Sequence, residues 1–159
     1  MTTRPVRLFA LVAVAVAFAL SAQSAPAATG HLSGGGTASV GTLAFSQVAM
    51  NVAFGSSSSA SGSFNCLMAG RSSSVLGGFG LVHIMKVQAT PTTGSVSGSV
   101  ATFSGPGFVV MDGGQRFDIV VSVWVNVATQ QFQLTVLNLQ PSPIALETET
   151  FSSGGVSLR

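Results

Sequence analysis

Apolar and polar residues alternate along most of the chain, and this period of two predicts β-strands. Breaks rich in glycine, serine or proline separate the alternating stretches. The clearest apolar sets are Val48, Met50, Val52 and Phe54, then Phe64, Cys66 and Met68, and later Phe132, Leu134 and Val136. No stretch after residue 27 combines the period of 3.6 with the capping residues of a helix. The pattern predicts a single antiparallel all-β domain over residues 40–159, either a β-sandwich or a small closed β-barrel.

The longest alternation covers residues 98–127 and predicts the hairpin that anchors the fold. Its turn residues are Asp112, Gly113 and Gly114. Asp-Gly and Gly-Gly pairs supply the positive φ angles that a two-residue loop requires, and such a loop places Phe108 and Val110 on the apolar face of residues 117–125. A three-residue loop would set Phe108 opposite Asp118 and move the apolar side chains to the other face. We therefore predict the two-residue loop.

Two further strands carry residues with candidate chemistry. Residues 75–89 predict a strand that places His83 on a largely apolar face. Residues 144–151 predict another strand, with Glu147 and Glu149 pointing to the same side.

The first 27 residues predict a signal peptide for export of the Sec type. Arg4 and Arg7 form a short basic region, residues 8–20 are an apolar run, and Ala-Pro-Ala at residues 25–27 offers small residues for a signal peptidase. The apolar run of 13 residues is shorter than the ~20 that a transmembrane helix needs. We therefore expect a secreted or extracytoplasmic protein with no transmembrane helix after cleavage, and an uncleaved anchor is the alternative.

Residues 28–39 are rich in glycine and serine and predict a flexible leader before the β-domain. His31 lies in this segment, and we expect it to be solvated rather than a ligand.

Removing residues 1–27 changes the charge of the chain. The full sequence has six Lys and Arg and four Asp and Glu, but Arg4 and Arg7 belong to the signal. The charged residues that follow are Arg71, Lys86, Arg116 and Arg159 against Asp112, Asp118, Glu147 and Glu149. This balance, without basic clusters, gives no support to nucleic-acid binding. Zero net charge weakens the repulsion between copies, so self-association is possible.

Cys66 is the only cysteine, so the chain has neither an internal disulfide nor a cysteine-based metal site. Because Phe64 and Met68 share its side of the predicted strand, we expect a buried thiol, and an intermolecular disulfide is the alternative. The glycine-rich segments lack the Lys and Ser or Thr of a phosphate-binding loop. The hairpin carboxylates are too few for calcium. We predict no cofactor and no metal.

The hairpin also carries a family resemblance. GSVATFSGPG at residues 98–107 and FDIVV at residues 117–121 resemble the C-terminal half of small exported bacterial β-domains of the post-COAP type. Those domains also carry an earlier segment with Tyr, Asp and His, whereas this chain has no tyrosine and has Phe-Asn-Cys at residues 64–66. The resemblance implies an exported all-β domain and assigns no activity.

The side chains that could carry catalysis are few. Glu147 and Glu149 have the spacing of a glycosidase pair, but neighbouring like charges are also typical of an exposed edge strand. His83 could join a Ser-His-acid arrangement, but no G-x-S-x-G motif is present and a core histidine fits its apolar face better. At the hairpin, Asp112 is expected to bond the turn backbone, and Arg116 to pair with either nearby aspartate.

The sequence therefore favours a secreted, non-catalytic β-domain, a structural or binding module at the cell surface or in the medium. The alternative is a small secreted barrel enzyme, of the hydrolase or cyclase-like kind, that uses His83 and a carboxylate. His83 is the one pocket candidate, and an acid within ~3–4 Å of it would favour the enzyme.

Overall fold

The structure is a computed structural model, and it describes residues 29–40, 44–69 and 84–159. This part of the chain forms a 10-stranded sheet, with a short 3₁₀ turn, η1 (Ser56–Ser58), between two of the strands. The strands are β1 (Gly30–Val40), β2 (Ala44–Phe54), β3 (Ala60–Ala69), β4 (Ile84–Ala89), β5 (Thr93–Ser97), β6 (Val100–Met111), β7 (Arg116–Asn126), β8 (Gln131–Val136), β9 (Ile144–Ala145) and β10 (Glu149–Leu158). None of the described residues belongs to a helix long and apolar enough to cross a membrane. The all-β prediction is confirmed.

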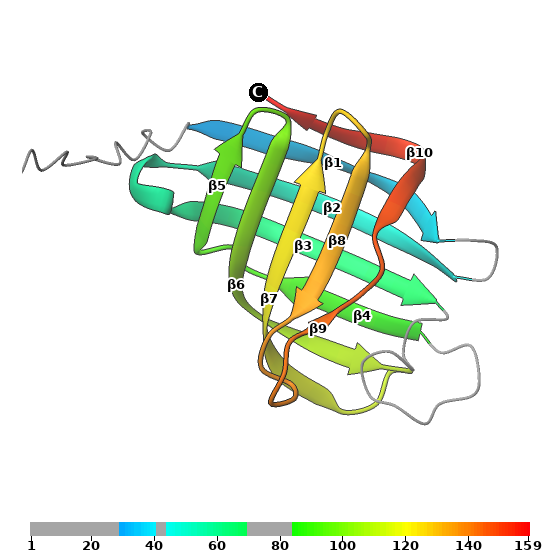
Figure 1. The fold of residues 1–159 in the computed structure, drawn as a ribbon. Coiled ribbons are helices and arrows are strands. Elements are labelled where there is room, and N and C mark those ends of the chain that lie inside the picture. Colours follow the sequence, from blue (N-terminus) through cyan, green and yellow to red (C-terminus); the bar gives the residue numbers. More distant parts are fainter. Residues whose placement is uncertain (1–28, 41–43, 70–83) are drawn as a thin grey trace, which may run out of the picture.

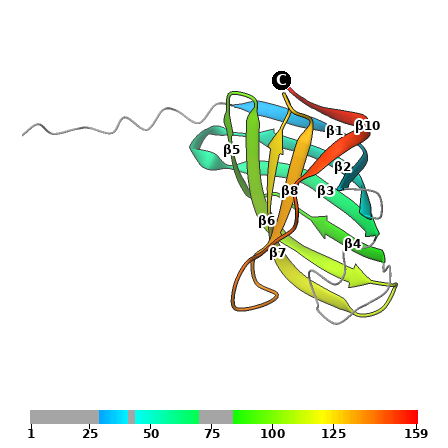
Figure 2. The ribbon, with the colours of Figure 1, turned by 45° about the vertical axis from the view of Figure 1, so that its right-hand side comes forward.

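The antiparallel pairings of the sheet form a ring (Figure 1). Neighbouring strands follow the order β10-β1-β2-β3-β4-β6-β7-β8, and β10 returns to β8 through the pairs Glu149↔Phe132 and Thr150↔Gln131. The long strand β6 pairs with β4 near one end and with β5 near the other. Figures 1 and 2 show β5 to β8 as one layer in front of β1 to β4. The domain is therefore barrel-like, with its core between the two layers.

The segment that we expected to be a flexible leader contains a fully paired strand. β1 pairs with β2 from Gly30↔Phe54 onwards, and with β10 on its other side. Leu32 and Ala38 are completely buried in the core. His31 is exposed, as expected, but its Nε2 lies 2.7 Å from an amide oxygen of β2. The leader prediction was wrong because glycine and serine indicate a permissive backbone, and neighbouring strands can still order such a backbone.

Glycines in β1 allow the close approach of backbones that this seam needs. Gly36 has a φ of +153°, and a Cβ atom at this position would collide with the carbonyl oxygen of Ser153 in β10. On the other side, a Cβ atom at Gly35 would collide with the backbone of Val48 in β2. Gly154 of β10 stands directly opposite Gly36. Glycine at these positions therefore lets β1 lie between its two neighbours.

The apolar faces predicted from alternation form the core. The residues named above for β2, β3 and β8 are each at most 4% exposed, and Cys66 is buried among them. Met85 and Val87 of β4 are also buried. Phe64 of β3 and Phe103 of β6 meet edge to face, with ring centroids 5.8 Å apart. Because β3 and β6 belong to opposite layers, this aromatic pair joins the two layers across the core.

The hairpin forms where predicted, but its register is shifted by one residue. β6 and β7 pair up to Val110↔Arg116, and Phe108 stands opposite Asp118. Val109 is completely buried, whereas Phe108 and Val110 are half-buried on the outer face. The predicted register, with Phe108 and Val110 in the core, was therefore wrong.

The turn explains the shift. Asp112 and Gly113 have φ angles of +48° and +70°, and the N–H of Gly114 donates to the carbonyl oxygen of Met111 at 2.8 Å. These are the features of a two-residue primed turn. Between this turn and the pair Val110↔Arg116, the returning side has two residues, 114 and 115, against Met111 alone, and this extra residue moves every later pair by one position. The alternation did not reveal this, because residues 108–111 are all apolar and either register buries apolar side chains.

The outer position of Phe108 is stabilised by Arg116. The guanidinium carbon of Arg116 lies 4.1 Å from the centroid of the Phe108 ring, and its Nη2 lies 3.1 Å from Asp118 Oδ1. The cation covers the exposed ring and is itself paired with the carboxylate. An aromatic residue can therefore remain outside the core in the observed register.

The observed register predicts different responses of two adjacent valines to the same change. Val109→Thr replaces a buried methyl group by a hydroxyl and should lower the free energy of unfolding by ~1–3 kcal/mol. Val110→Thr makes the same change on the outer face and should cost less than ~0.5 kcal/mol. Urea unfolding of both variants measures the difference. The opposite order would indicate the other register, in which Val110 faces the core.

Candidate functional site

One outer face of the barrel carries no charged side chain. It is formed by β5, β8, residues 100–104 of β6 and residues 120–126 of β7, and these strands lie side by side in the front layer of Figure 1. Side chains alternate along a strand, so the outward residues lie between the buried ones. The outward residues are Thr93, Ser95, Ser97, Val100, Thr102, Ser104, Val120, Ser122, Trp124, Asn126, Gln131, Gln133 and Thr135. We call this set the hydroxyl face.

Trp124 is the aromatic residue of the hydroxyl face. Its cross-strand neighbours are Thr102 on β6 and Gln133 on β8. Its side chain is partly exposed, and among the described residues its indole N–H has no hydrogen-bond partner. The indole therefore offers an apolar ring surface and a hydrogen-bond donor to a molecule outside the protein.

A hollow of about 250 Å³ lies beside Trp124 on the same face. Its lining residues other than Gly94 and Phe103 all carry hydroxyl groups, and they are Ser58, Thr93, Ser95, Thr102, Ser104 and Ser122. Thr102 both lines the hollow and stands opposite Trp124 in the β6–β7 pairing. The hydroxyls of Ser95 and Thr102 lie 3.0 Å apart. The hollow and the indole therefore form one continuous site of neutral polar groups.

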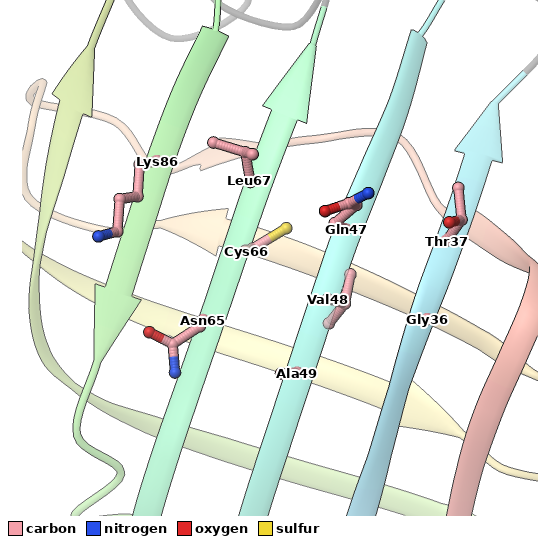
Figure 3. Close-up of a pocket in the computed structure, with 9 residues that line it drawn as sticks. All are labelled: Gly36, Thr37, Gln47, Val48, Ala49, Asn65, Cys66, Leu67 and Lys86. Carbon is pink, nitrogen blue, oxygen red and sulfur yellow. The ribbon is translucent and has the colours of Figure 1, made fainter. Parts of the chain in front are cut away.

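A second hollow, of about 600 Å³, lies on the outer face of β1 to β4 (Figure 3). Figure 3 shows Thr37, Gln47, Asn65 and Lys86 on four successive strands around it. Leu67, which is 40% exposed, also lines this hollow. This surface combines one cation, amides and an aliphatic side chain, and it has no aromatic residue in its lining.

A third hollow, of about 700 Å³, lies where β3, β4, β6 and β7 meet. Its polar side chains are engaged with one another. The amide of Gln88 donates to Asn65 Oδ1 at 2.5 Å, and Arg116 both pairs with Asp118 and covers Phe108. A ligand here would have to compete with an ion pair and a cation–π contact, whereas the internal contacts of the hydroxyl face are hydrogen bonds between neutral groups.

A carboxylate lies inside the barrel. Glu149 is 1% exposed, and its Oε1 accepts a hydrogen bond of 2.8 Å from the hydroxyl of Ser46. Glu147 is exposed, so the prediction that the two glutamates share one face of a strand was wrong. The reason is that β9 ends at Ala145 and β10 begins at Glu149, so no continuous strand connects the glutamates. They cannot act as the pair that their spacing suggested.

The other residues singled out in the sequence have structural contacts or lie outside the description. His83 lies outside the described residues. Asp112 Oδ1 accepts a hydrogen bond of 2.8 Å from the backbone N–H of Ile84, so this side chain ties the hairpin turn to β4. Within residues 29–40, 44–69 and 84–159, no three His, Cys, Asp or Glu side chains lie together as metal ligands.

Comparison with known proteins gives no match: no family model, curated protein or solved structure matches this chain. The resemblance to post-COAP domains therefore stays a prediction.

The hydroxyl face was only partly visible in the sequence. Alternation in residues 117–126 predicts a mixed, half-exposed face on one strand, and the structure confirms that its members lie outside the core: Asp118, Val120, Ser122, Trp124 and Asn126. The signal that was missed is the repeat of hydroxyl residues at every second position in residues 93–97 and 102–104. This repeat forms a binding surface only because β5 and β6 lie next to β7, and the order of the strands is a property of the tertiary structure.

The hydrogen bond inside the barrel gives a stability prediction. Ser46→Ala removes the described donor to the buried Glu149 carboxylate and should lower the free energy of unfolding by ~1–3 kcal/mol. Ser95→Ala removes a hydroxyl on the exposed hydroxyl face and should cost less than ~0.5 kcal/mol. Chemical denaturation of both variants checks this. Equal losses would show that the Ser46 hydroxyl does not stabilise the buried carboxylate.

Proposed function

We propose that this protein is an exported, non-catalytic binding module that acts at the cell surface or in the medium. The observation that carries the proposal is the hydroxyl face, where an uncharged surface presents an exposed indole beside a hollow lined by hydroxyl groups. Several of the described charged side chains lie outside this face. Lys86 is on the outer face of the opposite layer, Arg116 and Asp118 are near the hairpin turn, and Glu149 is inside the barrel.

The proposal of export rests on residues 1–27, which lie outside the described part of the chain. Their order of basic residues, apolar run and small residues is that of a Sec-type signal peptide. A barrel with its apolar side chains inside and few charges outside is compatible with work in the medium or on a cell surface, where neutral polar groups supply the contact with water.

The described carboxylates support a non-catalytic role because several have contacts that stabilise the fold. Asp118 pairs with Arg116 at the hairpin. Asp112 accepts the backbone N–H of Ile84. Catalytic acids need positions where they can reach a substrate, and these contacts hold the two aspartates in the architecture of the hairpin.

The binding function is tested by a charge placed on the hydroxyl face. Ser122→Lys adds a cation beside Trp124, and Ser61→Lys adds the same cation on the exposed outer side of β3. The full chain, expressed in a bacterial host, should be recovered outside the cytoplasm with a mass that corresponds to a start near residue 28. Its fraction that sediments with cell envelopes or insoluble extracellular material should fall several-fold in Ser122→Lys and stay unchanged in Ser61→Lys. Retention in the cytoplasm contradicts export, and equal sedimentation of both variants contradicts binding through this face.

The second candidate function is the barrel enzyme, and one observation favours it. Glu149 is a carboxylate inside the barrel, which is where such an enzyme would hold its acid. The candidate requires that His83 reach Glu149 and that substrate reach both side chains.

The enzyme candidate makes a spectroscopic prediction. If His83 contacts Glu149, Glu149→Gln should shift the imidazole resonances of His83 in an NMR spectrum and leave those of His31 unchanged. His31 is a suitable reference because it is exposed and contacts Asn51. Unchanged His83 resonances in a folded variant would remove the candidate.

A further inference from the structure

We propose that the hydroxyl face binds a neutral polysaccharide, with one sugar ring stacked on Trp124 and the adjoining sugar in the hydroxyl-lined hollow. This inference rests on the proposed binding function and names its ligand class. It follows from three properties of the site: its charge, its aromatic residue and the chemistry of its hollow.

The lack of charged residues on the hydroxyl face favours a neutral ligand over a charged one. No residue of the hydroxyl face is Asp, Glu, Lys or Arg, and the next residues on the outward side of β7, Asp118 and Arg116, pair with each other. A polyanion such as a nucleic acid or an acidic polysaccharide would lose its hydration here without meeting a cation. A neutral ligand whose polar groups are hydroxyls exchanges its hydrogen bonds with water for hydrogen bonds with side chains of similar polarity, at little cost in desolvation.

The indole ring of Trp124 has a flat apolar surface that complements one face of a sugar ring. A pyranose ring has a C–H face that is apolar and hydroxyl groups around its edge. The indole has the complementary form, with an apolar ring surface and one N–H donor that no described residue accepts. Thr102 and Gln133 stand on either side of Trp124. The Thr102 hydroxyl also bonds Ser95 and the Gln133 amide nitrogen donates to Leu146 O, but Gln133 Oε1 and the second lone pair of the Thr102 hydroxyl can still accept from the edge of the ring.

The hollow extends this recognition to a second sugar. Thr102 lies one strand away from Trp124, and neighbouring strands are ~4.8 Å apart, which is about the width of a sugar ring. The lining of the hollow includes Thr102 and Ser104 of β6 and Thr93 and Ser95 of β5. The hydroxyls of Ser104 and Ser122 have no described hydrogen-bond partner within the protein, so they remain available to ligand hydroxyls. A chain of linked sugars running across β7, β6 and β5 would contact all of these groups.

The fluorescence of Trp124 can also be used to measure binding at this site. It is the only tryptophan, and the chain has no tyrosine, so its fluorescence reports on this site alone. Titration of the exported protein with soluble neutral oligosaccharides of cellulose, chitin and mannan should give a saturable change in emission with at least one of them. Polygalacturonate, an acidic polysaccharide, should give none.

Variants locate the binding. On the insoluble form of the polysaccharide that binds, Trp124→Ala should lower the affinity by about 10-fold or more. Trp124→Phe keeps an aromatic surface and should retain a larger share of the affinity. Phe45→Ala is the matched control, because Phe45 is 46% exposed on the outer face of β2, in the opposite layer. Circular dichroism shows whether each variant is folded.

The outcomes separate the ligand class from the binding function. If neutral polysaccharides bind and Trp124→Ala binds equally well, the site is elsewhere and the inference is overturned. If none binds, or only the acidic polysaccharide does, while Ser122→Lys still lowers sedimentation with envelopes, the ligand class is wrong and the binding module stands. If neither polysaccharide nor envelope is bound, both proposals fail.

Discussion

Closure of the sheet is the constraint on which the rest of this structure depends. A strand at the edge of a sheet leaves backbone N–H and C=O groups without partners, and a ring of strands removes most such edges. Here the closure passes through β10, which pairs with β1 along most of its length and with β8 through two residue pairs. The glycines at the β1–β10 seam allow the backbones to approach, and this is the physical reason for the glycine-rich sequence at the start of the domain.

Closure also separates the two faces of every strand. One side of each strand points into a core that contains phenylalanine, methionine and valine, and the other meets solvent. Because the chain has few charged residues, its outer surface is made largely of hydroxyl and amide side chains. Two of the charged side chains make contacts within the fold. Arg116 covers the ring of Phe108 on the outer face, and Glu149 accepts a hydrogen bond inside the barrel. The hydroxyl face is the part of the surface where this neutral chemistry is most continuous.

The errors in the sequence-based interpretation have a common cause. Segments were judged by their own composition, while their conformation was decided by neighbours distant in the sequence. Residues 30–40 looked unable to pack, yet β2 and β10 order them. Residues 108–111 fitted either register, and in the observed one an extra residue follows the turn and Arg116 covers the outward ring of Phe108. Glu149 looked like an exposed edge residue until ring closure placed it inside.

The sequence by itself determined the all-β class, the inward residues of β2, β3 and β8, and the position of the hairpin turn. It could do so because the period of two and the turn residues are local properties. The tertiary structure alone decided that the sheet closes, which register the hairpin takes, and that Trp124 stands between Thr102 and Gln133 beside a hollow lined by hydroxyl groups. These features depend on strand order and pairing, which join residues far apart in the chain and leave no mark in any single stretch of it.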